Sequence, residues 1–134
     1  MSQGWLLDTN ILSDLVRNPS GRVAEQIRRC GESHVRTSIV VAAELQFCAA
    51  KKGSERLTHQ LETILGAIEV LPFTAPADHL YGELRTKLEK AGKPIGGNDM
   101  LIAAHALASD HILVTDNERE FSRIEGLTIE NWLR

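Results

Sequence analysis

Short segments bounded by turn-forming residues recur along the chain and predict the strands of a sheet. They lie at residues 4–8, 33–37, 67–71, 111–114 and 127–129. A short apolar segment with Gly, Pro, Asn or Asp at its ends is typical of a strand that is buried on both faces. The sequence therefore predicts about five strands, with the segment at 127–129 placed at an edge of the sheet.

Between these segments the hydrophobic positions recur every three or four residues, which is the spacing of one face of a helix. The expected helices span 9–16, 19 or 20 to 30, 38 to about 50, 54–66, 74 or 76 to 91, and a segment that begins at Asn98. Ser38 and Asn98 are expected to cap the helices that follow them. Strands that alternate with helices predict a single α/β domain over residues 1–134, with a mainly parallel sheet and helices on both faces.

The composition is that of an ordinary globular domain rather than of a globally basic nucleic-acid binder. The formal net charge is −3, whereas broad nucleic-acid surfaces carry a clear positive excess. A nuclease is still compatible with this charge, because it gathers acids in its cleft and needs basic residues only at the rim. No apolar segment reaches the roughly 18 residues of a membrane span, no signal peptide precedes the first strand, and Cys30 and Cys48 lack the spacing of a metal or redox pair. We therefore expect a cytoplasmic protein with reduced thiols.

Four acidic residues lie at strand ends or in apolar helices, where the fold could bring them together in one site. Asp8 and Asp116 follow the first and the fourth strand, at the same edge of a parallel sheet. Asp99 opens the almost wholly apolar helix that leads into the fourth strand, and Glu44 is the only charge in another apolar helix before its end. Each acid alone could cap a helix or face solvent. Together they would repel one another unless they were protonated or bridged by a cation, and oxygen ligands suit Mg²⁺ or Mn²⁺.

Four motifs occur along the chain in the same order as in a known family. They are Leu7-Asp8-Thr9-Asn10, Ala43-Glu44-Leu45, the segment from Asn98 to Ala106, and the segment from Val114 to Phe121. Through these motifs the chain resembles the PIN-domain proteins, and within them the VapC-type toxins, over nearly its whole length. Each motif alone is weak, but four motifs in order at matching separations are specific.

The resemblance implies a three-layer α/β/α sandwich with a mainly parallel sheet of about five strands, and an endoribonuclease that uses Mg²⁺ or, as a substitute, Mn²⁺. By motif position Asp8, Glu44 and Asp99 match the family's main acids, with Asp8 and Asp99 as the strongest metal ligands. At the fourth position the family has Thr, any residue, and then Asp or Asn. Asn117 occupies that slot and Asp116 lies one place earlier, so we place Asp116 with the catalytic acids while the pattern leaves either side chain open.

Further side chains are expected to support the acids or to hold RNA. Thr115 and Ser38 are candidates for hydroxyls that support the acids, and Asn10 is a candidate for orienting Asp8. RNA contacts should come from basic residues at the rim of the cleft. The candidates are Arg85, Lys87, Lys93 and Arg119. His105, inside the apolar helix, is expected to be a packed histidine rather than a catalytic one.

VapC-type toxins pair as homodimers and are silenced by a cognate VapB-type antitoxin, so the resemblance implies both partners, a larger toxin–antitoxin assembly and RNA as the substrate. The apolar stripes of the helices at 9–16 and 54–66 are candidates for the groove that takes the antitoxin. The Pro94-Ile95-Gly96 loop and the Arg119-Glu120-Phe121 segment resemble members that cut initiator tRNA in its anticodon stem-loop, whereas other members cut ribosomal RNA.

Two other classes of small α/β protein, and an inactive form of the same fold, are the alternatives. A receiver-type signalling domain also holds Mg²⁺ with acids at strand ends, but it needs an acceptor Asp after a middle strand, and here 68–71 leads to Pro72. A haloacid-dehalogenase-type phosphatase needs Asp-x-Asp after the first strand, and Asn10 occupies the second position. A PIN fold that only binds partners has no use for the acids, so their presence favours an enzyme.

Overall fold

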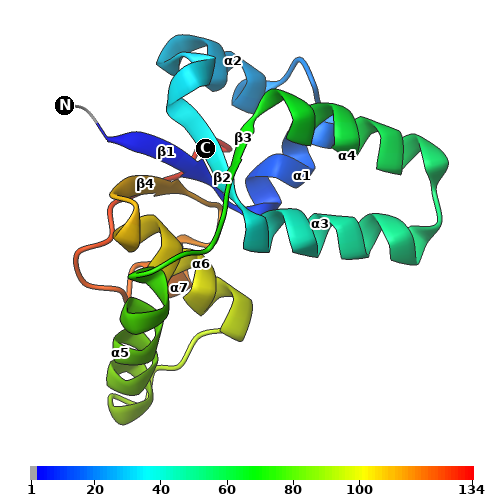
Figure 1. Cartoon of the computed structure of the whole chain (residues 1–134). Helices are drawn as coiled ribbons and strands as arrows, with labels where there is room; N and C mark the ends of the chain where they lie inside the picture. The colour runs from blue at the N-terminus through cyan, green and yellow to red at the C-terminus, as the bar shows by residue number, and fades with distance from the viewer. Residues whose placement is uncertain (1–2) are drawn as a thin grey trace.

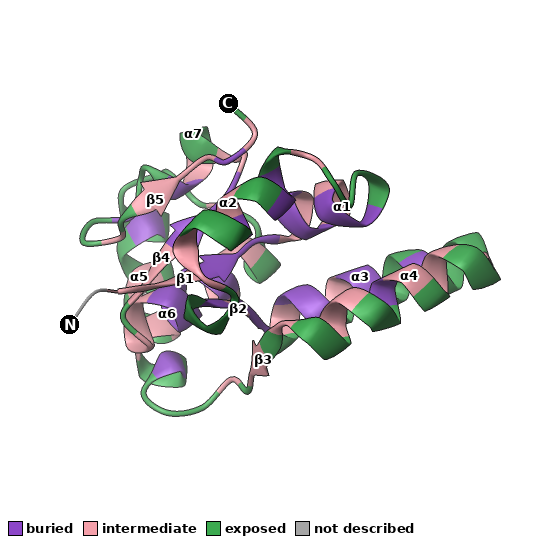
Figure 2. Ribbon diagram, turned by 90° about the horizontal axis from the view of Figure 1, so that it is seen from above, coloured by how far each residue is buried: buried purple, intermediate pink, exposed green. Residues whose placement is uncertain are grey.

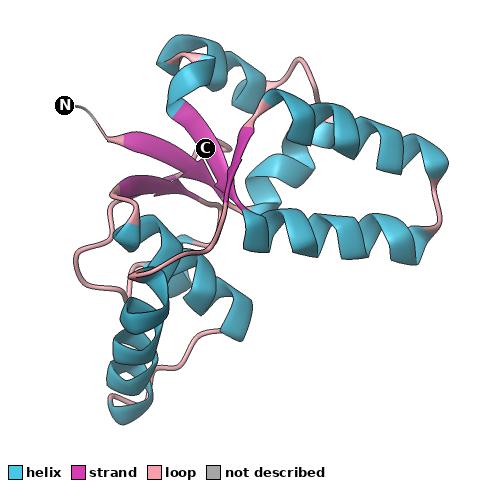
Figure 3. Cartoon of the chain, in the orientation of Figure 1, coloured by secondary structure: helices cyan, strands magenta, loops and turns pink. Residues whose placement is uncertain are grey.

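A parallel five-stranded sheet forms the centre of the structure, a computed structural model that describes residues 3–134 (Figure 3). Its strands are β1 (Gly4–Leu7), β2 (Val35–Ser38), β3 (Glu69–Leu71), β4 (His111–Val114) and β5 (Ile129–Glu130). They lie in the order β3-β2-β1-β4-β5, so β1 is central, with β2 on one side and β4 on the other. Every neighbouring pair runs parallel, and parallel strands must be joined by crossover connections.

Helices make these crossovers and cover both faces of the sheet. They are α1 (Thr9–Arg17), α2 (Arg22–Cys30), α3 (Ile39–Lys52), α4 (Glu55–Ala67), α5 (Ala77–Lys90), α6 (Gly97–Ala108) and α7 (Glu118–Phe121), with a short 3₁₀ turn, η1, at Glu32–His34. The path from β1 through β2 to β3 crosses the sheet in one direction, and the path from β3 through β4 to β5 returns in the other. Because such crossovers are right-handed, α1 to α4 lie on one face and α5 to α7 on the other, as Figure 1 shows. The predicted α/β/α sandwich is confirmed.

The core lies where the two central strands meet the helices. Leu6 and Leu7 of β1, and Leu113 and Val114 of β4, are completely buried, as expected for strands covered on both faces. Phe121 of α7 is the largest of the completely buried side chains. Figure 2 shows the buried residues gathered on the sheet and on the inner sides of the helices. Within residues 3–134 no helix combines the length and the apolar character needed to cross a bilayer.

The helix α2 begins later than the sequence predicted. Its expected start was residue 19 or 20, but the helix starts at Arg22. A turn precedes it, in which the backbone N–H of Gly21 donates to the carbonyl of Asn18 at 2.9 Å, and Gly21 becomes the N-cap. The other predicted helices and strands form with their ends displaced by a few residues at most.

Asn98 does not cap α6, so that prediction was wrong. The helix begins one residue earlier, at Gly97, with Gly96 as its N-cap. Asn98 therefore lies in the first turn, where its side chain is free to reach a neighbouring helix instead of its own backbone. The short helix α7 was not predicted at all, because four residues are too few to carry a periodic pattern.

Candidate active site

The sheet has a switch point between its two central strands. The chain leaves β1 for α1 on one face, and it leaves β4 for α7 on the other face. The two connections diverge and open a crevice outside the carboxyl ends of these strands, which is where open α/β sheets bind their ligands. Asp8 follows β1 directly and Thr115 follows β4 directly, so both stand at this crevice.

Asp8 is a buried carboxylate held by two hydrogen bonds. Its side chain is the N-cap of α1, and Oδ1 accepts the N–H of Thr9 at 2.7 Å. Oδ2 accepts the hydroxyl proton of Thr115 at 2.7 Å, so Thr115 contacts this acid, as expected from the sequence. Only 2% of Asp8 is exposed. Burial raises the pKa of Asp8 above its usual value, although both threonines lower it through their hydrogen bonds.

Glu44 reaches the same crevice from α3. Ser38 ends β2 and caps α3, as predicted, since its hydroxyl accepts the N–H of Val40 at 3.0 Å. On the second turn of this helix, Glu44 accepts the Thr9 hydroxyl proton at Oε1, at 2.8 Å, and the Asn98 amide at Oε2, at 3.3 Å. Thr9 follows Asp8 in the chain and Asn98 precedes Asp99, so these two bonds hold Glu44 beside both acids. Glu44 therefore does not lie on the outer face of its helix.

Asp99 is the acid of the cleft whose pKa is raised furthest. It lies in the first turn of α6 and is half-buried. Burial, the charge of Asp8, a hydrogen bond and charge from Glu120, and the charge of Glu44 together raise its pKa to about 7. Three carboxyl groups, from the end of β1, from α3 and from α7, thus act on Asp99, which is the situation that a divalent cation relieves.

Glu120 also belongs to this cluster, although it was not among the site residues expected from the sequence. Asn117 is the N-cap of α7, so Glu120 is the third residue of the helix, the position whose side chain turns back toward the cap. The amide of Asn117 donates to Oε2 of Glu120 at 3.2 Å and to Oδ2 of Asp99 at 3.4 Å. The three-residue spacing from Asn117 was the available signal.

The two candidates for the fourth position have different surroundings. The carboxylate of Asp116 accepts a hydrogen bond from Asn131 at 2.9 Å and lies 3.4 Å from Arg134, both in the C-terminal tail. Asn117, in contrast, joins Asp99 and Glu120. The contacts of Asp116 therefore do not place its carboxylate with the other acids as expected, and Asn117 is the one that enters the cluster.

Two of the expected supports have other contacts. Asn10 does not orient Asp8: its side-chain oxygen accepts the backbone N–H of Asp116 at 3.0 Å and so anchors the turn after β4. The Ser38 hydroxyl contacts Val40 and His105 rather than an acid. Ser38 makes the local bond that caps a helix, whereas Asn10 bonds a turn far away in the chain, a contact that its spacing from Asp8 does not reveal.

The candidate RNA-binding residues divide into two pairs. Arg85 and Lys87 lie on α5, where Arg85 contacts Glu89 and Lys87 bonds Glu125 at 2.8 Å. Lys93 and Arg119 are exposed, the first on the loop before α6 and the second on α7. These are the two elements that carry Asp99 and Glu120, so Lys93 and Arg119 are the better placed pair.

A divalent ion fits the chemistry of this cleft. The donors are carboxylate and amide oxygens, which suit Mg²⁺ or Mn²⁺, and the pKa of Asp99 is raised by burial and by the charges of the neighbouring acids. In residues 3–134 no three Asp, Glu, His or Cys side chains already form a complete metal-holding group.

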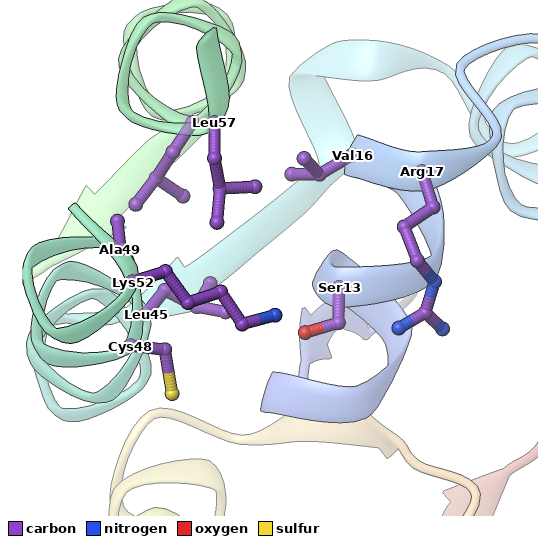
Figure 4. A pocket seen from close by; sticks show the side chains of 9 residues that line it. Ser13, Val16, Arg17, Leu45, Cys48, Ala49, Lys52 and Leu57 are labelled. Atoms are coloured by element: carbon purple, nitrogen blue, oxygen red, sulfur yellow. The ribbon is translucent and has the colours of Figure 1, made fainter. Parts of the chain in front are cut away.

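A separate apolar groove of about 80 Å³ lies between α1, α3 and α4 (Figure 4). Its walls include Val16 of α1, Leu45 of α3 and Leu57 of α4. Arg17 and Lys52 add positive charge at its sides. The groove therefore combines an apolar floor with a basic rim, and it is formed by the helices at 9–16 and 54–66 that the sequence singled out.

Comparisons with known proteins agree with this geometry. The family model described as "PIN domain" matches residues 5–127. "Ribonuclease VapC2" of Rickettsia felis is 38% identical over 96% of this chain and 97% of its own, and "tRNA(fMet)-specific endonuclease VapC" of Shigella flexneri is 35% identical over the same shares. A crystal structure of VapBC2 from Rickettsia felis, bound to a DNA fragment from its promoter, superposes with a TM-score of 0.89 at 37% identity, over 96% of this chain and 98% of that one.

We predict that, without metal, the free energy of unfolding contains an Asp99 contribution that falls as pH rises from 3.8 to about 7. In that interval the folded chain keeps a proton that the unfolded chain has lost, so rising pH favours unfolding. Urea unfolding in chelator at about pH 5 and about pH 8 measures the fall. Asp99→Asn should make it smaller, whereas Glu62→Gln, at an exposed position on α4, should not. An unchanged fall in Asp99→Asn would contradict the raised pKa.

Proposed function

The chain belongs to the PIN-domain family as a VapC-type member, and we propose that it is a divalent-cation-dependent endoribonuclease that acts as the toxin of a toxin–antitoxin pair. One observation carries the proposal. Asp99 is half-buried beside Asp8, Glu44 and Glu120, which come from three separate elements, and burial together with these three acids raises its pKa to about 7. A fold does not gather uncompensated carboxylates at a switch point for stability, so the arrangement favours a site that is completed by a cation.

The side chains of the cleft have distinct roles in this proposal. Asp8 and Asp99 hold the ion, with Glu44 and Glu120 beside them and Mg²⁺ as the expected metal. When bound, the ion polarises the scissile phosphate and lowers the pKa of an attacking water. Thr115 keeps both the position and the charge of Asp8, because its hydroxyl bonds the ionised carboxylate.

RNA is the substrate class that this cleft suits, and the exposed Lys93 and Arg119 supply phosphate contacts at its rim. The Shigella flexneri relative bears a name that specifies tRNA(fMet). That name, together with the Pro94-Ile95-Gly96 and Arg119-Glu120-Phe121 segments, supports initiator tRNA, cut in its anticodon stem-loop, as the target. Such a protein acts in the cytoplasm, where its substrate is.

The groove between α1, α3 and α4 is the proposed docking site of a VapB-type antitoxin. An apolar floor takes an apolar side chain of an antitoxin helix, and Arg17 and Lys52 attract acidic residues that flank it. The antitoxin completes inhibition by placing a cation, such as an Arg, among the carboxylates in the place of metal. Ile39 and Phe47, which are 46% and 64% exposed on α3, support a homodimer as the unit that joins a larger assembly.

We predict that Asp8→Asn and Asp99→Asn each lower RNA cleavage by about 100-fold or more. Each change keeps the shape of the side chain but removes a charged ligand. Cleavage of labelled tRNA in Mg²⁺, and again in chelator, measures the effect. Asp116→Asn is the matched control, because the contacts of Asp116 are with the C-terminal tail, and it should keep most of the activity. Full activity of Asp8→Asn would overturn the assignment of the site.

We predict that expression of the chain alone arrests growth, and that Asp99→Ala expressed to the same level does not. An uninhibited ribonuclease depletes an essential RNA, and the variant lacks a metal ligand. Growth curves with immunoblots measure this, and mapping of new RNA 5′ ends identifies the target. Equal arrest by both proteins would mean that toxicity is not catalytic. Growth in both cases would favour a PIN domain that is inactive or acts elsewhere.

We predict that Leu57→Asp weakens antitoxin binding by about 10-fold or more and leaves RNA cleavage unchanged. Leu57 lies in the first turn of α4, where an acid is compatible with the helix dipole. Its charge would nevertheless stand in the apolar groove, where burial without a partner is costly. Titration of the purified antitoxin measures the affinity, with Arg56→Asp on the exposed side of the same turn as the control. Equal affinity in both variants would exclude the groove.

A further inference from the structure

His105 is a buried histidine that the proposed reaction does not use. It lies in the second half of α6, only 3% of it is exposed, and the ring of Phe73 packs edge-on against it at 5.4 Å between centroids. Its Nδ1 lies 2.7 Å from the hydroxyl oxygen of Ser38, which is completely buried. The backbone of Pro72, whose only polar group is a carbonyl, also acts on the ring and raises its pKa, against the larger effect of burial.

The partners of His105 determine where its proton lies. A carbonyl oxygen only accepts, so the ring nitrogen that meets Pro72 must carry a proton. Because Nδ1 faces Ser38, that protonated nitrogen is Nε2. The Ser38 oxygen already accepts the N–H of Val40 at 3.0 Å, and its own proton is free to point at Nδ1. The neutral ring thus accepts from Ser38 and donates to Pro72, and burial, which lowers the pKa of His105, favours this neutral form.

The contact is one of two hydrogen bonds that link α3 and α6. At one end, Ser38, the N-cap of α3, meets His105 of α6. Six residues further along α3, Glu44 meets Asn98, in the turn of α6 that also carries Asp99. The two helices therefore lie antiparallel at this contact, with a buried bond between Ser38 and His105 at one end and a more exposed bond between Glu44 and Asn98 at the other.

We propose that His105 is a positioning residue that acts through Ser38 to hold α3 against α6 and so sets the spacing between Glu44 and Asp99. The inference rests on the proposed function in one respect, since it takes these two acids to be parts of a cation site. It predicts that the hydrogen-bond acceptor at Nδ1 matters to the cleft, whereas the size of the ring alone does not.

Two variants of His105 separate its two hydrogen bonds. The amide oxygen of Asn lies close to the position of Nδ1, so His105→Asn keeps an acceptor for Ser38. The amide of Gln reaches the position of Nε2, so His105→Gln keeps the donor to Pro72 and loses the acceptor. Calorimetric titration of the full chain with Mn²⁺ should show about 10-fold weaker binding for His105→Gln and for Ser38→Ala, with His105→Asn close to wild type. The double variant should be no weaker than either single one.

Two readouts in the metal-free chain test the inference independently of cleavage. Long-range ¹H–¹⁵N spectra should report Nε2 protonated and Nδ1 unprotonated in wild type. The side-chain amide signal of Asn98 should move in His105→Gln and stay in place in His105→Asn. Thermal unfolding of each variant accompanies these measurements, because a merely structural role would lower affinity in proportion to stability in both variants.

The outcomes distinguish this inference from the proposed function. Wild-type affinity for Mn²⁺ in His105→Gln, an equal loss in His105→Asn, or a protonated Nδ1 would overturn the role of His105. If wild type binds Mn²⁺ and the variants behave as expected but no RNA is cut, the proposed function fails and the positioning role stands. If wild type binds no Mn²⁺, both fail.

Discussion

A buried carboxylate at the end of the central strand is the constraint on which the rest of the cleft depends. Asp8 has lost nearly all contact with water, and an ionised carboxylate in that state must be given hydrogen bonds or a cation. The backbone of Thr9 and the hydroxyl of Thr115 give it one bond each. They are brought together because β1 and β4 are neighbours in register, with Leu7 opposite Val114. The sheet thus buries the carboxylate of Asp8 and also places beside it the hydroxyl of Thr115, which bonds it.

The negative charge of the cleft is not neutralised by the side chains that bond its acids, and this excess of negative charge is what suits the cleft to a cation. Burial, together with the charges of three neighbouring acids, raises the pKa of Asp99 to about 7. A fold selected only for stability would have placed a Lys or Arg there or removed an acid. The cluster is instead held by neutral donors, the hydroxyl of Thr9 and the amides of Asn98 and Asn117, which orient the carboxylates without neutralising them. Room is thereby left for a positive charge from outside the chain.

The helix α3 connects the acidic cleft to the apolar groove. One side of it carries Glu44 into the cleft, and the other side carries Leu45 and Ala49 into the groove shared with α1 and α4. Its apolar character on nearly all sides, which the sequence showed clearly, reflects these separate contacts rather than burial in a single core. Under the proposed function, a partner that docks in the groove therefore touches the helix that also positions Glu44 in the cleft.

The sequence by itself determined the α/β alternation, the parallel sheet and three of the cleft acids, because Asp8, Glu44 and Asp99 each occupy a recognisable place at a strand end or in an apolar helix. These features depend on local periodicity and on the rule that parallel strands end at one edge. Only the tertiary structure showed that Asn117, and not Asp116, contacts Asp99, and that Glu120 joins the cluster. It also revealed the contact between Ser38 and His105. These contacts depend on side-chain directions across elements far apart in the chain, and residue spacing along one element does not contain that information.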